Sequence, residues 1–373
     1  MECEMQVLKD LATFGGKWML ARHSQKTGLQ LKIWKVVGTF NILLVSVLSA
    51  FCVTSRLIYI HRENVPKMML FLLLVKTVAA TLLCVISIRN SCFGHIGQFN
   101  EIQDGISRNC DLRVFSGATV SRLYPWLMKL NIVSHVFVKI IFILIYKQEN
   151  DELFPFLVNC FPEIYAMIVI TFQLYMAFAW IQYLKRRHEY VLKTTRKLKS
   201  SRFPNYLVLI HIRRLEKLIR FLYKFFMLSK EMFGITIFLS TMMCIFGVFY
   251  SIAVIIVNGT LETNKNVQIC DMFSDCVILM VFIVTITLSL DKLEIIAKKL
   301  PKSIYLVRNQ FENEEIRREL RFFAKYSKEL SPKFTAGCFK LDRHLLSSSL
   351  STLTTYIIVV IQFSVTTINT SED

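Results

Sequence analysis

Seven long apolar segments constrain this chain more than any other feature of its sequence. Of its 373 residues, 54% are hydrophobic and 30 are phenylalanine, a composition more apolar than that of ordinary soluble domains. A helix of about 20 apolar residues crosses the hydrocarbon core of a bilayer, so each segment predicts a membrane span. The predicted spans are residues 36–60, 68–88, 130–146, 156–184, 233–257, 272–290 and 346–368. The sequence therefore predicts an all-α membrane protein with seven transmembrane helices.

The distribution of basic residues predicts how these helices are oriented. Lys and Arg number 37 in residues 1–35, 89–122, 185–231 and 291–345, against 5 in the alternate connections. Because cytoplasmic loops carry the excess of basic residues, the first set is predicted to be cytoplasmic. The N-terminus is then cytoplasmic and the C-terminus extracellular, which is the reverse of G-protein-coupled receptors. The net charge of +18 follows from this asymmetry, so membrane lipids are expected partners and nucleic acid is not.

The same pattern predicts the organisation of the chain. The expected segments are a cytoplasmic N-terminal segment (1–35), four transmembrane helices with their loops (36–184), a cytoplasmic helical segment (185–232), transmembrane helices five and six (233–290), a second cytoplasmic helical segment (291–345), and a final helix with an extracellular tail (346–373). Apolar and basic residues alternate with helical spacing after residue 205, which predicts either a helix on the inner leaflet or a cytoplasmic continuation of span five. A second cytoplasmic helix is predicted over residues 303–330, ending before Ser331-Pro332.

The sequence contains no pattern typical of an enzyme or a metal site. Its ten cysteines form no Cys-x-x-Cys pair, its seven histidines are dispersed, and no Gly-rich phosphate loop is present. We therefore expect no enzymatic activity, no metal and no cofactor. Asn258-Gly259-Thr260 is a glycosylation sequon on the predicted extracellular side, which makes Asn258 a candidate for modification.

The last apolar segment carries a polar stripe along one helical face. Steps of three or four residues join Ser348, Thr352, Thr355, Val359, Gln362 and Thr366. Serine and threonine alone are equally typical of tight helix packing, because their hydroxyls bond to the carbonyls of their own helix. The amide of Gln362 is costly in hydrocarbon without partners, which favours a protein interior or a water-filled path.

Two motifs around this segment resemble the C-terminal signature of the insect gustatory receptor family. The first includes Gly337, Phe339, Asp342 and the pair Leu345-Leu346. The second is Thr355-Tyr356, five apolar residues and Gln362-Phe363. Together they cover about 30 residues at fixed spacing, with Cys338 as a mild departure from the family pattern.

The resemblance implies a ligand-gated cation channel built from four subunits. The final helices of a homotetramer, or of a heterotetramer with other gustatory receptors, would line a central pore for cations in the plasma membrane of sensory neurons. Related receptors place their hydrophobic gate at the position of Val359, where four apolar side chains would exclude water. No charged residue lies between Leu345 and Thr370, which favours weak ion selectivity.

The resemblance places the pocket for a small-molecule tastant among the outer halves of spans two to six. Ionisable and aromatic residues at that depth are the candidates: Lys139, Tyr146, Glu163, Tyr165 and Tyr250. A structural ion pair and an interfacial aromatic belt remain open alternatives for them. The identity of the tastant is open, although the short loops are more similar to those of bitter-type receptors. The alternative function is a seven-helix receptor that signals through an intracellular partner.

Overall fold

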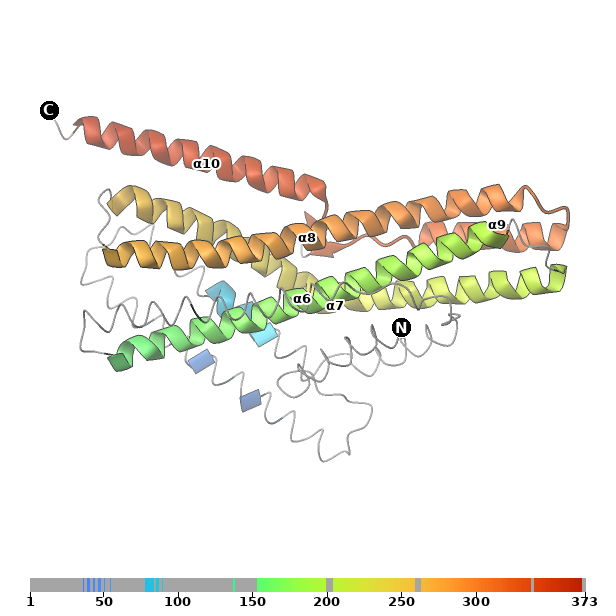
Figure 1. The fold of residues 1–373 in the computed structure, drawn as a ribbon, viewed down its shortest axis with the longest axis horizontal. Helices are drawn as coiled ribbons and strands as arrows, with labels where there is room; N and C mark the ends of the chain where they lie inside the picture. Colours follow the sequence, from blue (N-terminus) through green and yellow to red (C-terminus); the bar gives the residue numbers. More distant parts are fainter. Residues whose placement is uncertain are drawn as a thin grey trace.

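The computed structural model describes residues 153–198, 204–258, 263–336 and 339–370, together with scattered positions before residue 138. Among the continuously described residues, three long helices form the centre, and two shorter helices and a hairpin pack beside them (Figure 1). The elements are α6 (Leu153–Leu198), α7 (Asn205–Asn258), α8 (Thr263–Arg308), α9 (Glu314–Glu329), β1 (Thr335–Ala336), β2 (Phe339–Lys340) and α10 (Arg343–Thr370). The two strands pair antiparallel, with Thr335 opposite Lys340.

The three long helices are far longer than a bilayer is thick. α6 and α8 have 46 residues each and α7 has 54. At 1.5 Å per residue they extend roughly 70 to 80 Å, more than twice the roughly 30 Å of a hydrocarbon core. α7 includes both the amphipathic stretch after residue 205 and the predicted span 233–257, so of the two interpretations of that stretch the continuous helix is confirmed.

Four of the seven predicted spans fall within described helices. Spans 156–184, 233–257, 272–290 and 346–368 lie in α6, α7, α8 and α10 respectively. By length and apolar composition, one helix among the described residues is able to cross a membrane, over Asn205–Phe249 of α7, and the core helix of a soluble protein has the same properties. Within spans 36–60, 68–88 and 130–146 the structure describes only scattered residues, and these are helical.

The single helix predicted over residues 303–330 is wrong at its start. α8 continues through this region to Arg308, a turn follows, and α9 begins only at Glu314. The reason is a helix cap: the Asn313 side chain accepts hydrogen bonds from the backbone amides of Glu315 (2.9 Å) and Ile316 (3.3 Å). Such a cap satisfies amides that have no partner within the helix and so starts a new helix there. α9 ends at Glu329, before Ser331-Pro332 as predicted.

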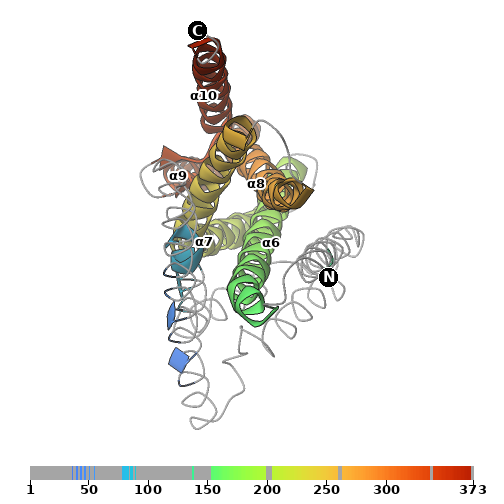
Figure 2. The same ribbon diagram turned by 90° about the vertical axis from the view of Figure 1, so that its left-hand side faces the viewer.

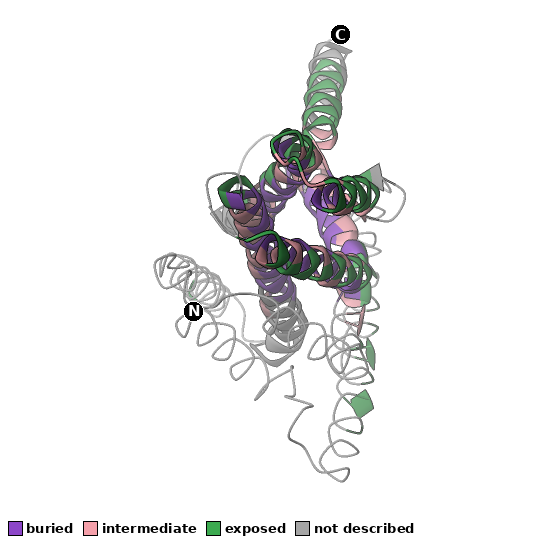
Figure 3. Cartoon of the chain, turned by 90° about the vertical axis from the view of Figure 1, so that its right-hand side faces the viewer, coloured by how far each residue is buried: buried purple, intermediate pink, exposed green. Residues whose placement is uncertain are grey.

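The described helices share an apolar core that is rich in aromatic residues. α9 buries Ile316, Leu320 and Phe323, which recur at helical spacing, against its neighbours. The Trp180 ring lies 4.9 Å from that of Phe225, between the centroids, and joins α6 to α7. Figure 3 shows the buried residues on the inner faces of these helices and the exposed residues on their outer faces.

A close contact joins α7 and α8 within the predicted spans. A Cβ atom added to Gly247 would lie 2.5 Å from the Cys276 sulfur, so only glycine fits at this position without rearrangement. Cys244 and Cys276 are both buried, and the Cys244 sulfur lies 3.4 Å from the Cys276 carbonyl oxygen. Here the glycine allows the two helix backbones to approach closely, as small residues do in helix pairs.

Candidate functional site

α10 leaves the bundle near its middle and diverges from α7 and α8 toward its C-terminal end (Figures 1 and 2). The N-terminal end of α10 is fixed by the segment before it. Phe334 and Leu341 are buried, and the Leu341 amide donates to the Phe334 carbonyl at 3.1 Å. Leu345 and Leu346 pack against the same core. α10 is therefore anchored at its base and extends as a single helix beyond it.

Asp342, one of the motif residues, caps this helix. Its Oδ1 accepts a hydrogen bond from the backbone amide of Leu345 at 3.2 Å, three residues into the turn. A carboxylate at this position satisfies an amide that lacks a helical partner and interacts favourably with the helix dipole. Of the other motif residues, Gly337 lies outside the described residues, and the side chains of Phe339 and Phe363 lie outside them as well.

Ion pairs join the base of α10 to α8. Arg343 Nε lies 2.7 Å from an Asp291 oxygen, and Lys340 Nζ lies 3.2 Å from a Glu294 oxygen. Lys340 Nζ also lies 3.5 Å from an Asp342 oxygen, so this one cation of β2 pairs with both Glu294 and the capping Asp342. We call these five residues the basal ion cluster. It ties the start of α10 to a helix that begins 80 residues earlier in the chain.

Glu294 is the most buried carboxylate of the basal ion cluster. Burial raises its pKa, but hydrogen bonds and charges from Lys298 and Lys340 outweigh burial and hold the pKa below its ordinary value of 4.5. The pKa of Lys340 is raised, chiefly by its hydrogen bond to Glu294. Both groups are therefore charged at neutral pH. The contribution of Glu294 to stability is lost as pH falls through its lowered pKa, and that of Lys340 as pH rises above 10.5.

The polar stripe of α10 is exposed in the single chain. The exposed members are Ser348, Thr352, Thr355, Val359 and Gln362. Thr352 donates its hydroxyl proton to the Ser348 carbonyl and Thr355 to the Ser351 carbonyl, both at 3.0 Å. The hydroxyl donors of these two threonines are thus used within the helix. Thr366 lies in α10 with its side chain outside the described part of the structure.

Beside this stripe, an aromatic contact attaches α10 to α7. The Tyr356 ring stacks on that of Phe249, with centroids 4.1 Å apart and planes inclined at 36°. Val359 is 39% exposed and Ile358 is 51% exposed. Tyr356 therefore holds one side of α10 to its own chain and leaves the neighbouring polar side uncovered.

The side chains of the predicted ligand residues all lie outside the described part of the structure, so their grouping stays a prediction. Glu163 and Tyr165 lie on α6 and Tyr250 lies on α7, but their side chains are outside the described part. Lys139 and Tyr146 lie outside the described residues altogether, and the side chain of Asn258, the last residue of α7, lies outside the described part as well. Sequence reasoning missed the basal ion cluster, for which the Asp342 motif was the one available signal.

The sequence profile of the 7tm chemosensory receptors matches residues 17–367 of this chain. The chain belongs to the 7tm chemosensory receptor family. This match extends the resemblance seen in the last 40 residues to nearly the whole receptor. Among curated protein sequences, none matches this receptor.

Solved structures show the same fold over the same length. This receptor is similar to the insect olfactory receptor OR5 from Machilis hrabei in complex with eugenol, with a TM-score of 0.68 at 11% identity. A second structure of OR5 gives a TM-score of 0.63 at 10% identity. Each alignment covers 96% of this receptor and 98% of OR5. At this level of identity the likeness establishes the fold of a chemosensory receptor and leaves the stimulus open.

Proposed function

We propose that this receptor is one subunit of a tetrameric, weakly selective cation channel that opens when a small-molecule tastant binds. The observation that carries the proposal is the exposed polar face of α10, which its own chain leaves uncovered. An apolar helix with a Gln on its open face is stable in a membrane when that face meets water or another subunit. Four copies of α10 around one axis would supply both.

The length and charge of the long helices support the proposed orientation. Each of α6, α7 and α8 extends far beyond a bilayer, and the extensions are rich in Lys and Arg. The charged halves, together with α9, would form a cytoplasmic domain that holds the four subunits together. The seven spans, the cytoplasmic N-terminus and the extracellular C-terminus are part of this proposal.

Val359 is the proposed gate. It lies on the exposed face between Thr355 and Gln362, so four copies would form an apolar ring between two polar rings. A narrow apolar ring expels water and stops ions without filling the pore. Val359→Ser should raise the current in the absence of stimulus, whereas Val359→Ile should lower it or leave it unchanged. Unchanged basal current in Val359→Ser, at normal surface expression, would remove Val359 from the gate.

The proposed stimulus is a small organic molecule of the tastant class. The olfactory receptor OR5 has a small organic molecule, eugenol, bound to it. In this receptor the candidate contacts are Lys139, Tyr146, Glu163, Tyr165 and Tyr250. Glu163→Gln or Tyr250→Phe should change agonist potency at constant expression, and equal potency would assign these residues to scaffolding. An agonist opens the channel only as far as it binds the open form better than the closed form.

Excised-patch recording tests the function directly. The receptor, expressed alone in a heterologous cell, is exposed to a panel of tastants while the cytosolic face of the patch is washed with buffer. Agonist-evoked cation current in the washed patch supports the channel. A response in intact cells that disappears on excision, and returns with cytosol, would support signalling through an intracellular partner.

A further inference from the structure

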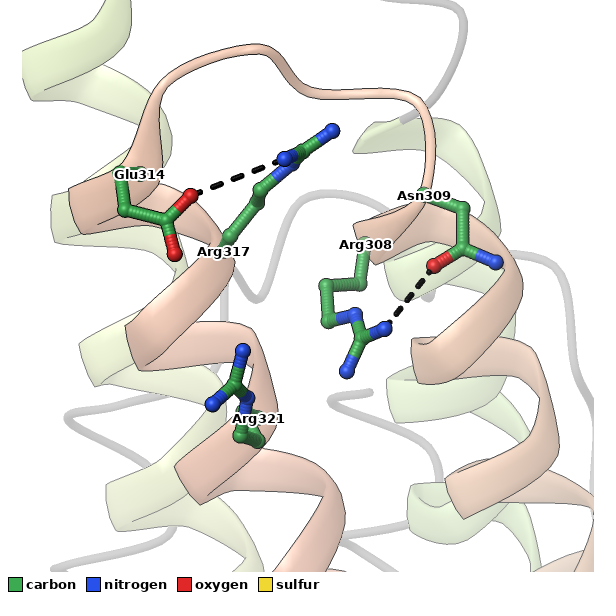
Figure 4. Close-up of a pocket in the computed structure, with 5 residues that line it drawn as sticks. All are labelled: Arg308, Asn309, Glu314, Arg317 and Arg321. Carbon is green, nitrogen blue, oxygen red and sulfur yellow. Dashed lines mark hydrogen bonds and ion pairs between the residues drawn. The ribbon is translucent and has the colours of Figure 1, made fainter.

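A cavity of about 310 Å³ lies where α8 ends and α9 begins. Its lining residues are Arg308, Asn309, Glu314, Arg317 and Arg321. Arg308 and Arg321 project from facing helices into the same space, and Arg317 lies nearer the connecting turn (Figure 4). Neither the polar stripe of α10 nor the proposed tastant contacts use any of these residues.

The cavity carries an excess of positive charge. Three guanidinium groups face one carboxylate, that of Glu314, whose oxygen lies 3.6 Å from Arg317 Nη1. Arg308 donates to a neutral acceptor, the side-chain oxygen of Asn309, at 3.2 Å. Arg321 forms no ion pair within the part of the chain that the structure describes. Two of the three cationic charges are therefore left without an anion.

Two of these arginines are held in position by uncharged groups. Arg317 donates its Nε–H to the backbone carbonyl of Phe311. The Arg308 guanidinium lies over the Tyr305 ring, 5.6 Å from its centroid. These contacts order the guanidinium groups without neutralising them, so a ligand would meet them with little further loss of side-chain freedom.

The start of α9 adds to the positive potential. This helix of 16 residues begins at Glu314, beside the cavity, so its dipole presents a positive end there. The backbone amides of Glu315 and Ile316 already donate their hydrogen bonds to the Asn313 side chain, so they are not available to a ligand. Binding at this place would therefore rest on the arginine side chains, with the dipole as a minor contribution.

We infer that this cavity binds a soluble small molecule with two phosphate groups. Arginine presents paired N–H donors that match phosphate oxygens, and three arginines that face one carboxylate suit a ligand with more than one negative charge. The volume is at the lower end of the range for small-molecule sites, which suits a compact phosphate compound.

The position of the cavity favours a soluble ligand over a membrane lipid. In the proposed orientation span six ends near Leu290, and Arg308 lies 18 residues further along the same helix. That distance is roughly 27 Å along the axis, several times the Debye length of about 8 Å in physiological salt. A headgroup held in the inner leaflet would not reach the three arginines.

Calorimetric titration tests the inference on the full chain in phosphatidylcholine nanodiscs, with inorganic pyrophosphate as the probe. Arg321→Gln should weaken binding about tenfold, because one charged hydrogen-bond donor is lost. Glu314→Gln should tighten it several-fold by removing a like charge. Arg318→Gln is the matched control, since Arg318 is exposed on α9 and does not line the cavity. This control should bind like the unaltered receptor.

Three results would overturn the inference. These are an absence of pyrophosphate binding at low salt, an equal loss of pyrophosphate binding in Arg318→Gln and Arg321→Gln, and a loss of pyrophosphate binding when the nanodisc contains phosphatidylinositol bisphosphate. The last two would assign the arginines to unspecific attraction and to lipid contact respectively. The titration needs no current, so its outcome is separate from that of the proposed channel function. Gel filtration of each variant checks that the receptor remains folded.

Discussion

α9 and α10 differ in how far their apolar side chains are buried. α9 has 16 residues, most of them polar or charged, yet it buries Ile316, Leu320 and Phe323 completely. α10 has 28 residues and is far more apolar, yet its described face is largely exposed. The apolar side chains of α9 are covered by its own chain, whereas the exposed apolar side chains of α10 are the kind that lipid or another protein surface covers. The difference separates a helix that its own chain covers from a helix that, in the proposed channel, meets other subunits.

The largest effect is expected in the packed helix. Phe323→Ala should lower the free energy of unfolding by about 3–5 kcal/mol, because Phe323 is fully buried and its loss leaves a cavity. Its neighbour Phe322 is 52% exposed, so Phe322→Ala should change stability by about 0.5 kcal/mol or less. Thermal unfolding of the purified receptor at one scan rate compares the two variants. Equal melting temperatures would show that α9 is not the packed helix described here.

An intermediate effect is expected where α7 meets α8. Gly247→Ala should destabilise the receptor by about 1–3 kcal/mol, because the new methyl group would overlap the Cys276 sulfur. Cys276→Ala removes that sulfur, so the double variant should be more stable than Gly247→Ala alone. The melting temperatures of Gly247→Ala and of the double variant, measured at one scan rate, test this expectation. Failure of the second substitution to restore stability would place the cost of Gly247→Ala elsewhere.

A smaller effect is expected at the start of α10. Asp342→Ala removes the cap and should cost about 1 kcal/mol, which makes amide exchange in the first turn roughly fivefold faster. Asp342→Asn keeps an oxygen that can accept from Leu345 and should exchange nearly as slowly as the unaltered receptor. Hydrogen–deuterium exchange with mass spectrometry follows the peptide at residues 343–350. Rapid exchange in both variants would attribute the effect to the carboxylate charge instead of the cap.

The smallest effect is expected within the basal ion cluster. A double-mutant cycle of Lys340→Gln and Glu294→Gln should give a coupling energy of about 0.2–1 kcal/mol, since Lys340 is 42% exposed and its ion pair is partly screened. The Lys325–Glu329 pair of α9 is the control. Its atoms lie 4.0 Å apart and both side chains are more than half exposed, so its coupling should be close to zero. Equal coupling energies in the two cycles would remove the proposed role of the cluster in fixing α10.

Much of this fold follows from apolar periodicity, and the exceptions have local causes. The predicted spans in α6, α7, α8 and α10 coincide with helices, because long apolar runs leave few alternatives. The turn before α9 was missed because charged residues on both sides of Asn313 continue a helical pattern, and only the side-chain cap interrupts it. The pairing of Arg343 with Asp291 joins positions 52 residues apart, which no local pattern reveals. The polar stripe was predicted by spacing alone, since exposure on one helical face repeats every three or four residues.

Cysteine accessibility along α10 tests the central claim most directly. Thr355→Cys and Gln362→Cys, introduced separately into a receptor whose native current is unaffected by a small cationic thiol reagent, should become modified during stimulation and change the current. Tyr356→Cys, on the side that stacks against Phe249, should react much more slowly. If the two stripe positions remain unmodified while the receptor still conducts, the open face of α10 does not line the ion path.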